Sequence, residues 1–393
     1  MFFNLQKKEQ RERYKGLLKN MGALSNLFSE SDTPYLPYRA HENIFCRAFE
    51  ATNLSRGDIT ADAQKEKIGI ALKTWVGTDN QKIAEFNKNK PDYASLEGLD
   101  LVKKIAEFRN ERIRITKNMR GIEEMLYHVV KRIPKAMQIW ECGLDEIDIN
   151  NIKLLKKDDK KTNPYFSDGK HMYHFLVSKS TLYMIFEGMQ LVDNFDVDIL
   201  DDPYSLLEQM FATKQVDDQT SPIMNLFEEK HGEMLKLMLY TVGTKNQLRG
   251  AKGYPIENSD KYAFVPLHSG INQWNANGRK RNEDELYIPY PVNAKEKKPN
   301  FFPPRDEEFQ IVLPDGTELS AKVCQANGKA IMSNPNKALG HWLLRDVFEV
   351  APGTILNYGD LQRFGIDSVV FEKLEDKRYS VNFCLDPAST PSD

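Results

Sequence analysis

Apolar residues in the first part of the chain follow helical spacing and then strand spacing. Leucines and methionines recur at helical intervals across residues 5–30, and a second apolar stripe after Arg39 consists of Ile44, Phe45, Ala48 and Phe49. Two helices are therefore expected. Residues 58–64 alternate strictly between polar and apolar side chains, and residues 68–76 (IGIALKTWV) are mostly apolar. These two segments predict strands on either side of the charged turn KEK.

The middle of the chain mixes the two kinds of spacing. Residues 81–88 (QKIAEFNK) predict the start of a helix, and residues 97–135 are expected to be mostly helical. Segments 137–155 and 172–186 are rich in Ile, Leu, Val, Tyr and Phe and predict strands, and an amphipathic helix is expected around residues 226–239. The order of these elements indicates an α/β or α+β first domain, which we place at residues 1–255.

From about Tyr262 onward, short strands and turn signals replace the helical periodicity. Residues 309–323 (FQIVLPDGTELSAKV) predict a hairpin with Asp315 and Gly316 at its tip. Residues 368–383 predict a second hairpin that turns at residues 375–377, and one helix is expected over residues 337–347. A mostly β second domain at residues 262–388 follows, so the fold class is α+β with more than one domain.

Composition and charge narrow the functional classes. The chain has 393 residues, of which 40% are hydrophobic, and a formal net charge of −3. This balance excludes a binder that is basic throughout, so nucleic-acid binding must come from a locally basic face. The four cysteines are too widely spaced for a zinc cluster. The charged N-terminus predicts no secretory signal, and no apolar run is long enough to span a bilayer, so a cytoplasmic location without membrane attachment is expected.

Two segments of the predicted second domain are dense in amide and basic side chains. Residues 269–291 (SGINQWNANGRKRNEDELYIPYP) surround one Trp with Asn, Gln, Arg and Lys, and residues 324–345 (CQANGKAIMSNPNKALGHWLLR) repeat the theme. Asn and Gln can make two hydrogen bonds to adenine edges, Arg can do the same with guanine, and Arg and Lys neutralise phosphates. Asn and Gly are also common in ordinary turns. Two such arms separated by a hairpin favour a grip on duplex DNA.

The C-terminal third resembles the B3-like pseudobarrel domain of several type II restriction endonucleases and, more distantly, of plant transcription factors. The resemblance lies in the two arms and in residues 300–316 (NFFPPRDEEFQIVLPDG) between them, and it covers roughly residues 265–385. It implies a seven-stranded pseudobarrel that reads the major groove through two arms. The first arm would hold Gln273, Trp274, Asn275, Asn277, Arg279 and Arg281, and the second would hold Gln325, Lys329, Asn334 and Asn336. An equally weighted alternative for Trp274 is that it anchors its loop in the core.

Asp62 and Lys73, on the two predicted strands of the first domain, resemble the PD-(D/E)xK nuclease pattern. The resemblance implies an α/β restriction-endonuclease-like core that binds Mg²⁺ through carboxylates, with Lys73 orienting or deprotonating the attacking water. Glu42 would be an added helix carboxylate, and Gln81 resembles a glutamine that some members place beside the active site. Ala71 departs from the pattern, which usually has Asp or Glu two residues before the lysine. Either Glu42 or Asp58 supplies the missing metal ligand, or the site is altered.

Together these resemblances imply a type II restriction endonuclease that hydrolyses both strands of DNA with Mg²⁺ and leaves 5′-phosphates. A homodimer or transient pairing on DNA is expected because the two strands have opposite polarity, and a cognate DNA methyltransferase is expected in the same system. The alternative is a DNA-binding protein without catalysis, which Ala71 supports. RNA recognition is a weaker alternative because aromatic residues for stacking single-stranded bases are sparse. The two histidines of residues 171–179 (HMYHFLVSK) fall in a predicted strand, where a spacing of three does not share a face.

Overall fold

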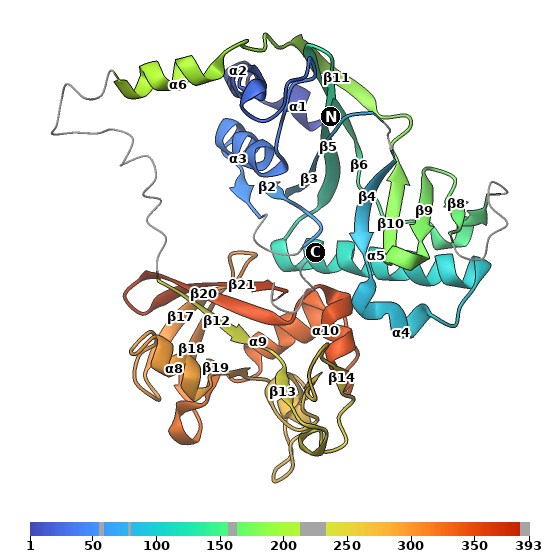
Figure 1. The fold of residues 1–393 in the computed structure, drawn as a ribbon. Helices are drawn as coiled ribbons and strands as arrows, with labels where there is room; N and C mark the ends of the chain where they lie inside the picture. The colour runs from blue at the N-terminus through green and yellow to red at the C-terminus, as the bar shows by residue number, and fades with distance from the viewer. Residues whose placement is uncertain (55–58, 78–79, 156–162, 213–232, 386–393) are drawn as a thin grey trace.

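The computed structural model describes residues 1–54, 59–77, 80–155, 163–212 and 233–385 (Figure 1). The N-terminal part is built on a six-stranded mixed sheet. Its hydrogen-bonded order is β1 (Thr52–Asn53), β2 (Ala63–Lys65), β3 (Ile68–Trp75), β5 (Glu124–Ile133), β6 (Ala136–Gly143) and β11 (Gln190–Asp196). Strands β3 and β5 are parallel, and the other neighbours are antiparallel.

Helices cover both faces of this sheet. The helices α1 (Phe2–Leu5), α2 (Lys8–Ala23) and α3 (Tyr38–Phe49) lie on one side of it (Figure 1). On the other side, α5 (Gly98–Arg120) makes the crossover between the parallel strands β3 and β5. The crossover ends at Gly121, whose left-handed backbone (φ 61°) lets its N–H bond to the Lys117 carbonyl. The short α4 (Lys90–Tyr93) precedes α5, and α6 (Pro203–Ala212) follows β11.

A second, antiparallel sheet of five strands lies beside the first. Its order is β4 (Asn80–Glu85), β10 (Thr181–Ile185), β9 (Met172–Leu176), β8 (Tyr165–Ser167) and β7 (Lys153–Leu154). Its inner residues, such as Phe166, Phe175 and Leu182, pack in one core with the α5 residues Ile105 and Phe108. The prediction of strands in residues 172–186 is confirmed by β9 and β10, and His174 stacks on Tyr165 of β8 and Tyr183 of β10.

The C-terminal part is mostly β. One sheet has seven strands in the order β12 (Met234–Met238), β20 (Ser368–Glu375), β21 (Arg378–Cys384), β17 (Glu308–Val312), β18 (Glu318–Cys324), β19 (Ala330–Asn334) and β16 (Ile288–Pro289). The end strands β12 and β16 lie close together, so the sheet curls back on itself without forming a closed barrel in the described residues. A small sheet follows the order β13 (Thr241–Gly243), β15 (Tyr262–Phe264) and β14 (Tyr254–Pro255). The helices are α8 (Val292–Lys297), α9 (Ala338–His341) and α10 (Tyr358–Phe364), and α9 continues as a π-helical turn over Trp342–Val347.

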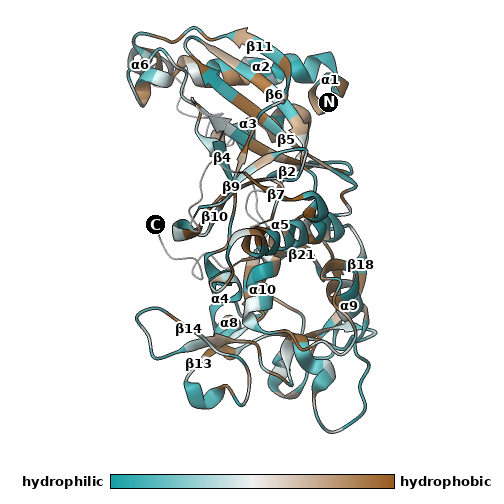
Figure 2. Ribbon diagram, turned by 90° about the vertical axis from the view of Figure 1, so that its right-hand side faces the viewer, coloured by the Kyte–Doolittle hydropathy of each residue, from teal (hydrophilic) through white to brown (hydrophobic). Residues whose placement is uncertain are grey.

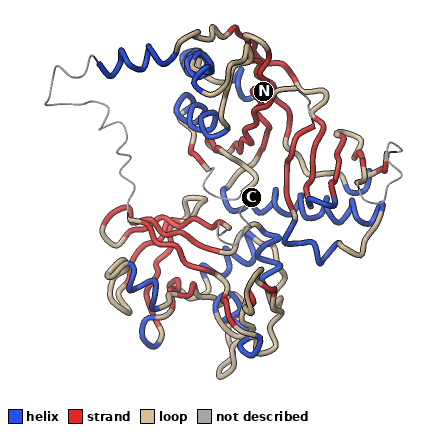
Figure 3. The backbone as a smooth tube through the Cα atoms, viewed as in Figure 1, coloured by secondary structure: helices blue, strands red, loops and turns tan. Residues whose placement is uncertain are grey.

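Helix α5 joins the two parts of the molecule. Its residues Leu101 and Ile105 are buried in the N-terminal core, while Ile115 and Met119 are buried in the C-terminal core. Figure 3 shows this helix running between the strands of the two parts, and Figure 2 shows both hydrophobic and hydrophilic residues along it. The two parts are therefore connected by a helix that is packed into both cores, and not only by an exposed linker.

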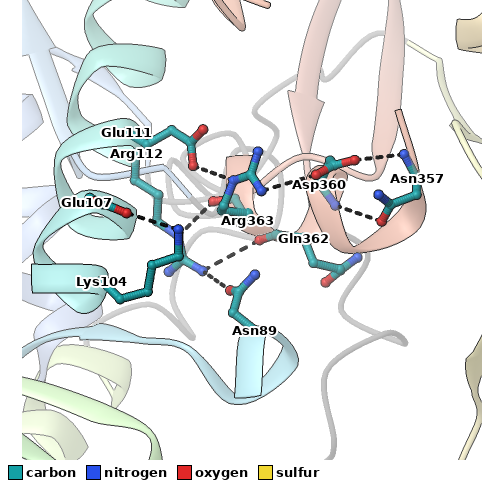
Figure 4. Close-up of polar contacts among 9 residues, drawn as sticks. All are labelled: Asn89, Lys104, Glu107, Glu111, Arg112, Asn357, Asp360, Gln362 and Arg363. Carbon is teal, nitrogen blue, oxygen red and sulfur yellow. Dashed lines mark hydrogen bonds and ion pairs between the residues drawn. The ribbon is translucent and has the colours of Figure 1, made fainter. Parts of the chain in front are cut away.

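Polar contacts fix α10 against α5 (Figure 4). The Arg112 guanidinium donates to the Glu85 carbonyl (2.8 Å) and to two carbonyls in the last turn of α10, those of Arg363 (3.2 Å) and Gln362 (3.5 Å). Glu111 accepts from Arg363 at 2.6 Å. A cation at the carbonyl end of a helix is favourably placed, so Arg112 helps to hold the C-terminal part in one orientation.

Several local predictions are confirmed. The helices α2 and α3, the strand β3, both C-terminal hairpins and the helix beginning at Ala338 form where the sequence pattern places them. Each of these elements satisfies its pattern within one short stretch of chain. Local spacing is then sufficient to identify the element.

Other predictions are wrong. Of the segment expected as a strand over 58–64, Asp58 lies outside the described residues and the strand begins only at Ala63. The remaining differences are explained by strand pairing: the residues expected to begin a helix at 81 form β4, which pairs with β10. Helix α5 ends at Arg120, and the residues after 123 form β5. Met234–Met238 is the edge strand β12 of the C-terminal sheet, not a helix of the first domain; residues 226–232 lie outside the described residues. Sheet pairing overrides local helical periodicity in these cases.

A buried hydrogen-bond chain ties α1, α2 and α3 to the sheet. The Tyr14 hydroxyl lies 2.7 Å from His41 Nε2 and 3.0 Å from His128 Nε2, and His128 Nδ1 lies 2.8 Å from Glu141 Oε1. Glu141 also accepts from the Phe3 N–H at 3.0 Å. One arrangement of protons satisfies every atom: His41 donates to Tyr14, Tyr14 to His128, and His128 to Glu141.

His41 is expected to make the protein less stable in weak acid. Burial and the neighbouring His128 lower the pKa of His41 well below its ordinary value of 6.5. The unfolded chain therefore takes up a proton below about pH 6.5 that the folded protein does not bind, which costs about 1.4 kcal/mol for each pH unit. Urea unfolding of the wild type and of His41→Gln across this range measures the effect. Equal pH slopes for the two proteins would contradict it.

Candidate nucleic-acid interface

A hollow of about 850 Å³ opens between the two polar arms of the C-terminal part. It lies between the turn after β15, the loop that leads to β16, and the connection from β18 to β19. Lys322, Asp306 and Tyr287 are also among the residues that line it. Seven of the ten residues predicted to contact DNA line it: Gln273, Arg279, Arg281, Gln325, Lys329, Asn334 and Asn336. Segments that are about 50 residues apart in sequence therefore face one space, as expected for a two-armed grip.

A buried carboxylate organises the first arm. Glu285 accepts two hydrogen bonds from Arg279, with NH2 at 2.8 Å and NH1 at 3.2 Å, and a third from Arg281 NH1 at 3.2 Å. Burial alone would raise the pKa of Glu285, but the Asn282 amide and the two guanidinium groups outweigh it and lower that pKa. Glu285 therefore stays ionised and holds both arginines in place.

Three residues of the predicted first arm do not line the hollow. The Asn275 side chain donates to the Leu267 carbonyl at 3.0 Å and contacts His268, so it braces its own turn. Trp274 is half-buried, which favours the anchoring role. Asn277 is exposed beside the loop. Gln273 lines the hollow but is itself mostly buried.

The second arm pairs an amide with a carboxylate. Asn334 Nδ2 donates to Glu308 Oε1 at 2.6 Å, and Ser320 donates to the other oxygen of Glu308 at 3.1 Å. Lys329 is exposed at the edge of the hollow. The second arm thus offers one amide, which Glu308 orients, and one unburied ammonium group to a ligand in the hollow.

In the N-terminal part, Asp62 and Lys73 lie close enough to interact electrostatically. Asp62 immediately precedes β2, where its Oδ2 accepts from the Leu72 N–H of β3 at 2.7 Å. Burial raises the pKa of Asp62 to about 6, although Lys73 opposes the shift. Burial also lowers the pKa of Lys73, and the charge of Asp62 opposes that shift in turn. Glu42 of α3 is buried and pairs with Arg39 at 3.0 Å. Its negative charge acts to raise the pKa of both Asp62 and Lys73.

Other predicted site residues fall differently. Ala71 is buried in the N-terminal core, so its face of β3 offers no carboxylate. Gln81 lies on β4 opposite Met184. The charge of its neighbour Lys82 acts to lower the pKa of Lys73. Asp58 lies outside the described residues. Within the described ranges, no three His, Cys, Asp or Glu side chains gather as a metal site. Glu42 lies near enough to Asp62 for its charge to raise the Asp62 pKa, and both carboxylates have the hard oxygen donors that Mg²⁺ prefers.

Arg109 contacts the segment that carries Asp62, and the sequence pattern did not reveal it. It is buried on α5 and donates to the Thr60 hydroxyl at 3.2 Å and to the Tyr127 hydroxyl at 3.0 Å. Its positive charge acts to lower the pKa of Lys73. Thr60, two residues before Asp62, is also held by Thr116 of α5. The signal in the sequence is an arginine midway between Ile105 and Ile113, on the buried stripe of the helix.

Comparison with known families adds a finding for the C-terminal part. Residues 248–375 match the family model of the NgoFVII C-terminal B3-like DNA-binding domain. This part of the chain is B3-like. The match contains both arms and the hollow between them, so the residues of the hollow lie within the part of the chain that is similar to this domain. A comparison with curated proteins finds no match. None of the helices in the described ranges has the length and apolar character needed to cross a bilayer.

Proposed function

We propose that the protein is a sequence-specific endonuclease for double-stranded DNA, in which the B3-like part reads the site and the N-terminal part cuts. The observation that carries the proposal is the hollow, because basic and amide side chains from two arms converge there within residues that match a restriction-enzyme DNA-binding domain. The hollow offers the hydrogen-bonding groups that distinguish base pairs in the major groove. The exposed Lys329 supplies positive charge for phosphates, and the exposed Arg279 offers a second basic group to the DNA.

The cutting half of the proposal rests on Asp62, Glu42 and Lys73. Asp62 and Glu42 would hold Mg²⁺, which supplies a Lewis acid that polarises the phosphate and acidifies a bound water. Lys73 would orient the attacking water and place positive charge beside the phosphate as it gains charge. The water oxygen bonds to phosphorus, the bond to the 3′-oxygen breaks, and the leaving oxygen takes up a proton. Arg109 and Thr116 hold Thr60 and thereby position Asp62.

Two copies would act together on one duplex, because its strands have opposite polarity and each copy has one such site. A DNA methyltransferase of the same specificity would protect the host's own sites. The second candidate is a DNA-binding protein without catalysis. The buried Ala71, where a carboxylate is expected, favours it.

DNA binding by the full chain is expected to depend steeply on salt and on both arms. Arg279→Ala combined with Lys329→Ala should weaken binding by roughly 30- to 1,000-fold, because each of the two contacts to a base or phosphate contributes about 1–2 kcal/mol. Fluorescence anisotropy with duplex DNA over a range of salt concentrations measures both quantities. The matched control, Lys8→Ala with Arg13→Ala, removes two exposed charges on α2 and should leave binding unchanged. A wild type that binds duplex DNA independently of salt would refute DNA binding at the hollow.

A further inference from the structure

The two arginines of the first arm are held by one carboxylate but differ in exposure. The side chain of Glu285 is 4% exposed, that of Arg281 is 17% exposed, and that of Arg279 is 57% exposed. A buried carboxylate on a surface that faces DNA is costly in itself, since it must be desolvated and it repels phosphates. Its three charge-assisted hydrogen bonds to the arginines offset that cost.

The guanidinium of Arg281 is occupied by contacts within the protein. Besides Glu285, it faces Gln273, and when the Gln273 amide is oriented with its oxygen toward Arg281, that oxygen accepts from NH1 at 3.0 Å and from NH2 at 3.3 Å. Gln273 is itself mostly buried. Gln273, Arg281 and Glu285 therefore form an internal frame, in which Arg281 bridges an amide and a carboxylate and has little surface left for a ligand.

Arg279 is held on one edge and open on the other. Its NH1 and NH2 groups face the two oxygens of Glu285, and NH1 also lies 3.4 Å from the Lys280 carbonyl. Among the described residues, none accepts from its Nε. A guanidinium has five N–H donors in a fixed plane, so the edge formed by Nε and the outer hydrogen of NH2 stays available. That edge matches the O6 and N7 acceptors of guanine in the major groove.

We infer that Arg279 reads a guanine and that Glu285 is the positioning residue that sets its orientation, with Arg281 completing the frame. This inference rests on the proposed DNA-reading function of the hollow and adds to it one base of the target site. A lysine at 279 would not reproduce this arrangement, because its single ammonium group cannot make a planar pair of hydrogen bonds to Glu285 and present a second planar pair to guanine. The ligand class is a duplex with a guanine at one required position.

The test is a binding selection with the full chain on duplexes of randomised sequence. The wild type should enrich a site that contains one invariant guanine. Glu285→Gln should lose preference for that guanine by at least about tenfold, while binding to non-specific DNA stays unchanged or strengthens, because a negative charge is removed. Arg279→Lys should lose the same preference and keep the salt dependence of binding. The matched control Glu283→Gln, which neutralises an exposed carboxylate on the same loop, should keep the preference.

Three outcomes would overturn the inference. The first is that Glu285→Gln and Arg279→Lys both select the wild-type site with wild-type affinity. The second is that Glu285→Gln loses specific and non-specific binding in equal proportion, which would indicate a purely structural carboxylate. The third is that Arg279→Ala keeps the site and weakens all sequences equally, which would make Arg279 a phosphate contact. If Glu285→Gln does not fold by thermal unfolding, the two Arg279 variants decide. A wild type that binds no duplex would refute the proposed function itself, and the inference with it.

Discussion

Asp62→Asn and Lys73→Ala are each expected to lower the rate of DNA cleavage in Mg²⁺ at least about 100-fold and to leave DNA binding intact. Asp62→Asn removes one of two carboxylates that would hold the metal, and Lys73→Ala removes the cation beside the phosphate; losses of this size are typical when one group that stabilises the transition state is deleted. Both residues lie in the N-terminal part, away from the hollow. Binding and cleavage should therefore separate in these variants.

The measurement is the appearance of discrete fragments from plasmid or phage DNA, with binding followed in parallel in Ca²⁺ or without added metal. Asp92→Asn on α4 and Lys67→Ala in the turn before β3 are matched controls, since both side chains are exposed and lie outside the proposed site. Mapping the fragments on a sequenced plasmid gives the recognition site and the cut position together. If the wild type binds DNA but yields no fragments, the non-catalytic alternative suggested by Ala71 replaces the nuclease proposal.

The elements that were predictable from the sequence are those whose evidence is local. The hairpin of β17 and β18 has alternating strands and an Asp-Gly turn within 17 residues, Glu308–Cys324, and it forms as expected. A helix start is predicted in residues 81–88, yet residues 80–85 form β4 because β10, about 100 residues later, pairs with them. The strand β12 likewise depends on β20. Its amphipathic spacing fits a helix equally well until the partner strand is known.

The candidate sites divide in the same way. The high content of Asn, Gln, Arg and Lys was enough to find the two arms, because each arm is one continuous segment and its composition can be read directly from the sequence. Composition could not separate Arg279 from Arg281, since the difference lies in the Glu285 and Gln273 contacts that only the folded loop creates. Arg109 was missed because its contacts are with Thr60 and Tyr127, which come from other elements.

Glu141→Ala is expected to lower the free energy of unfolding by about 3–5 kcal/mol, the cost of removing one partner from a fully buried hydrogen-bonded pair. In the folded protein, Glu141 accepts from His128 Nδ1 at 2.8 Å and from the Phe3 N–H at 3.0 Å. Both donors would lose their acceptor in a part of the core where water cannot replace it, because His128 and Glu141 are fully buried. A cavity would remain beside Phe3 as well, which adds to the loss.

Urea unfolding monitored by circular dichroism gives this free energy, and Glu124→Ala, an exposed carboxylate on β5, is the control that should change it by less than about 0.5 kcal/mol. Because the hydrogen-bond chain continues through Tyr14 to His41, which neighbours Glu42, the effect should reach the proposed cutting site as well. Glu141→Gln keeps an acceptor oxygen for one donor and should fall between the wild type and the alanine variant. A Glu141→Ala protein as stable as the wild type would show that the chain of buried polar groups does not hold α1 and α3 to the sheet.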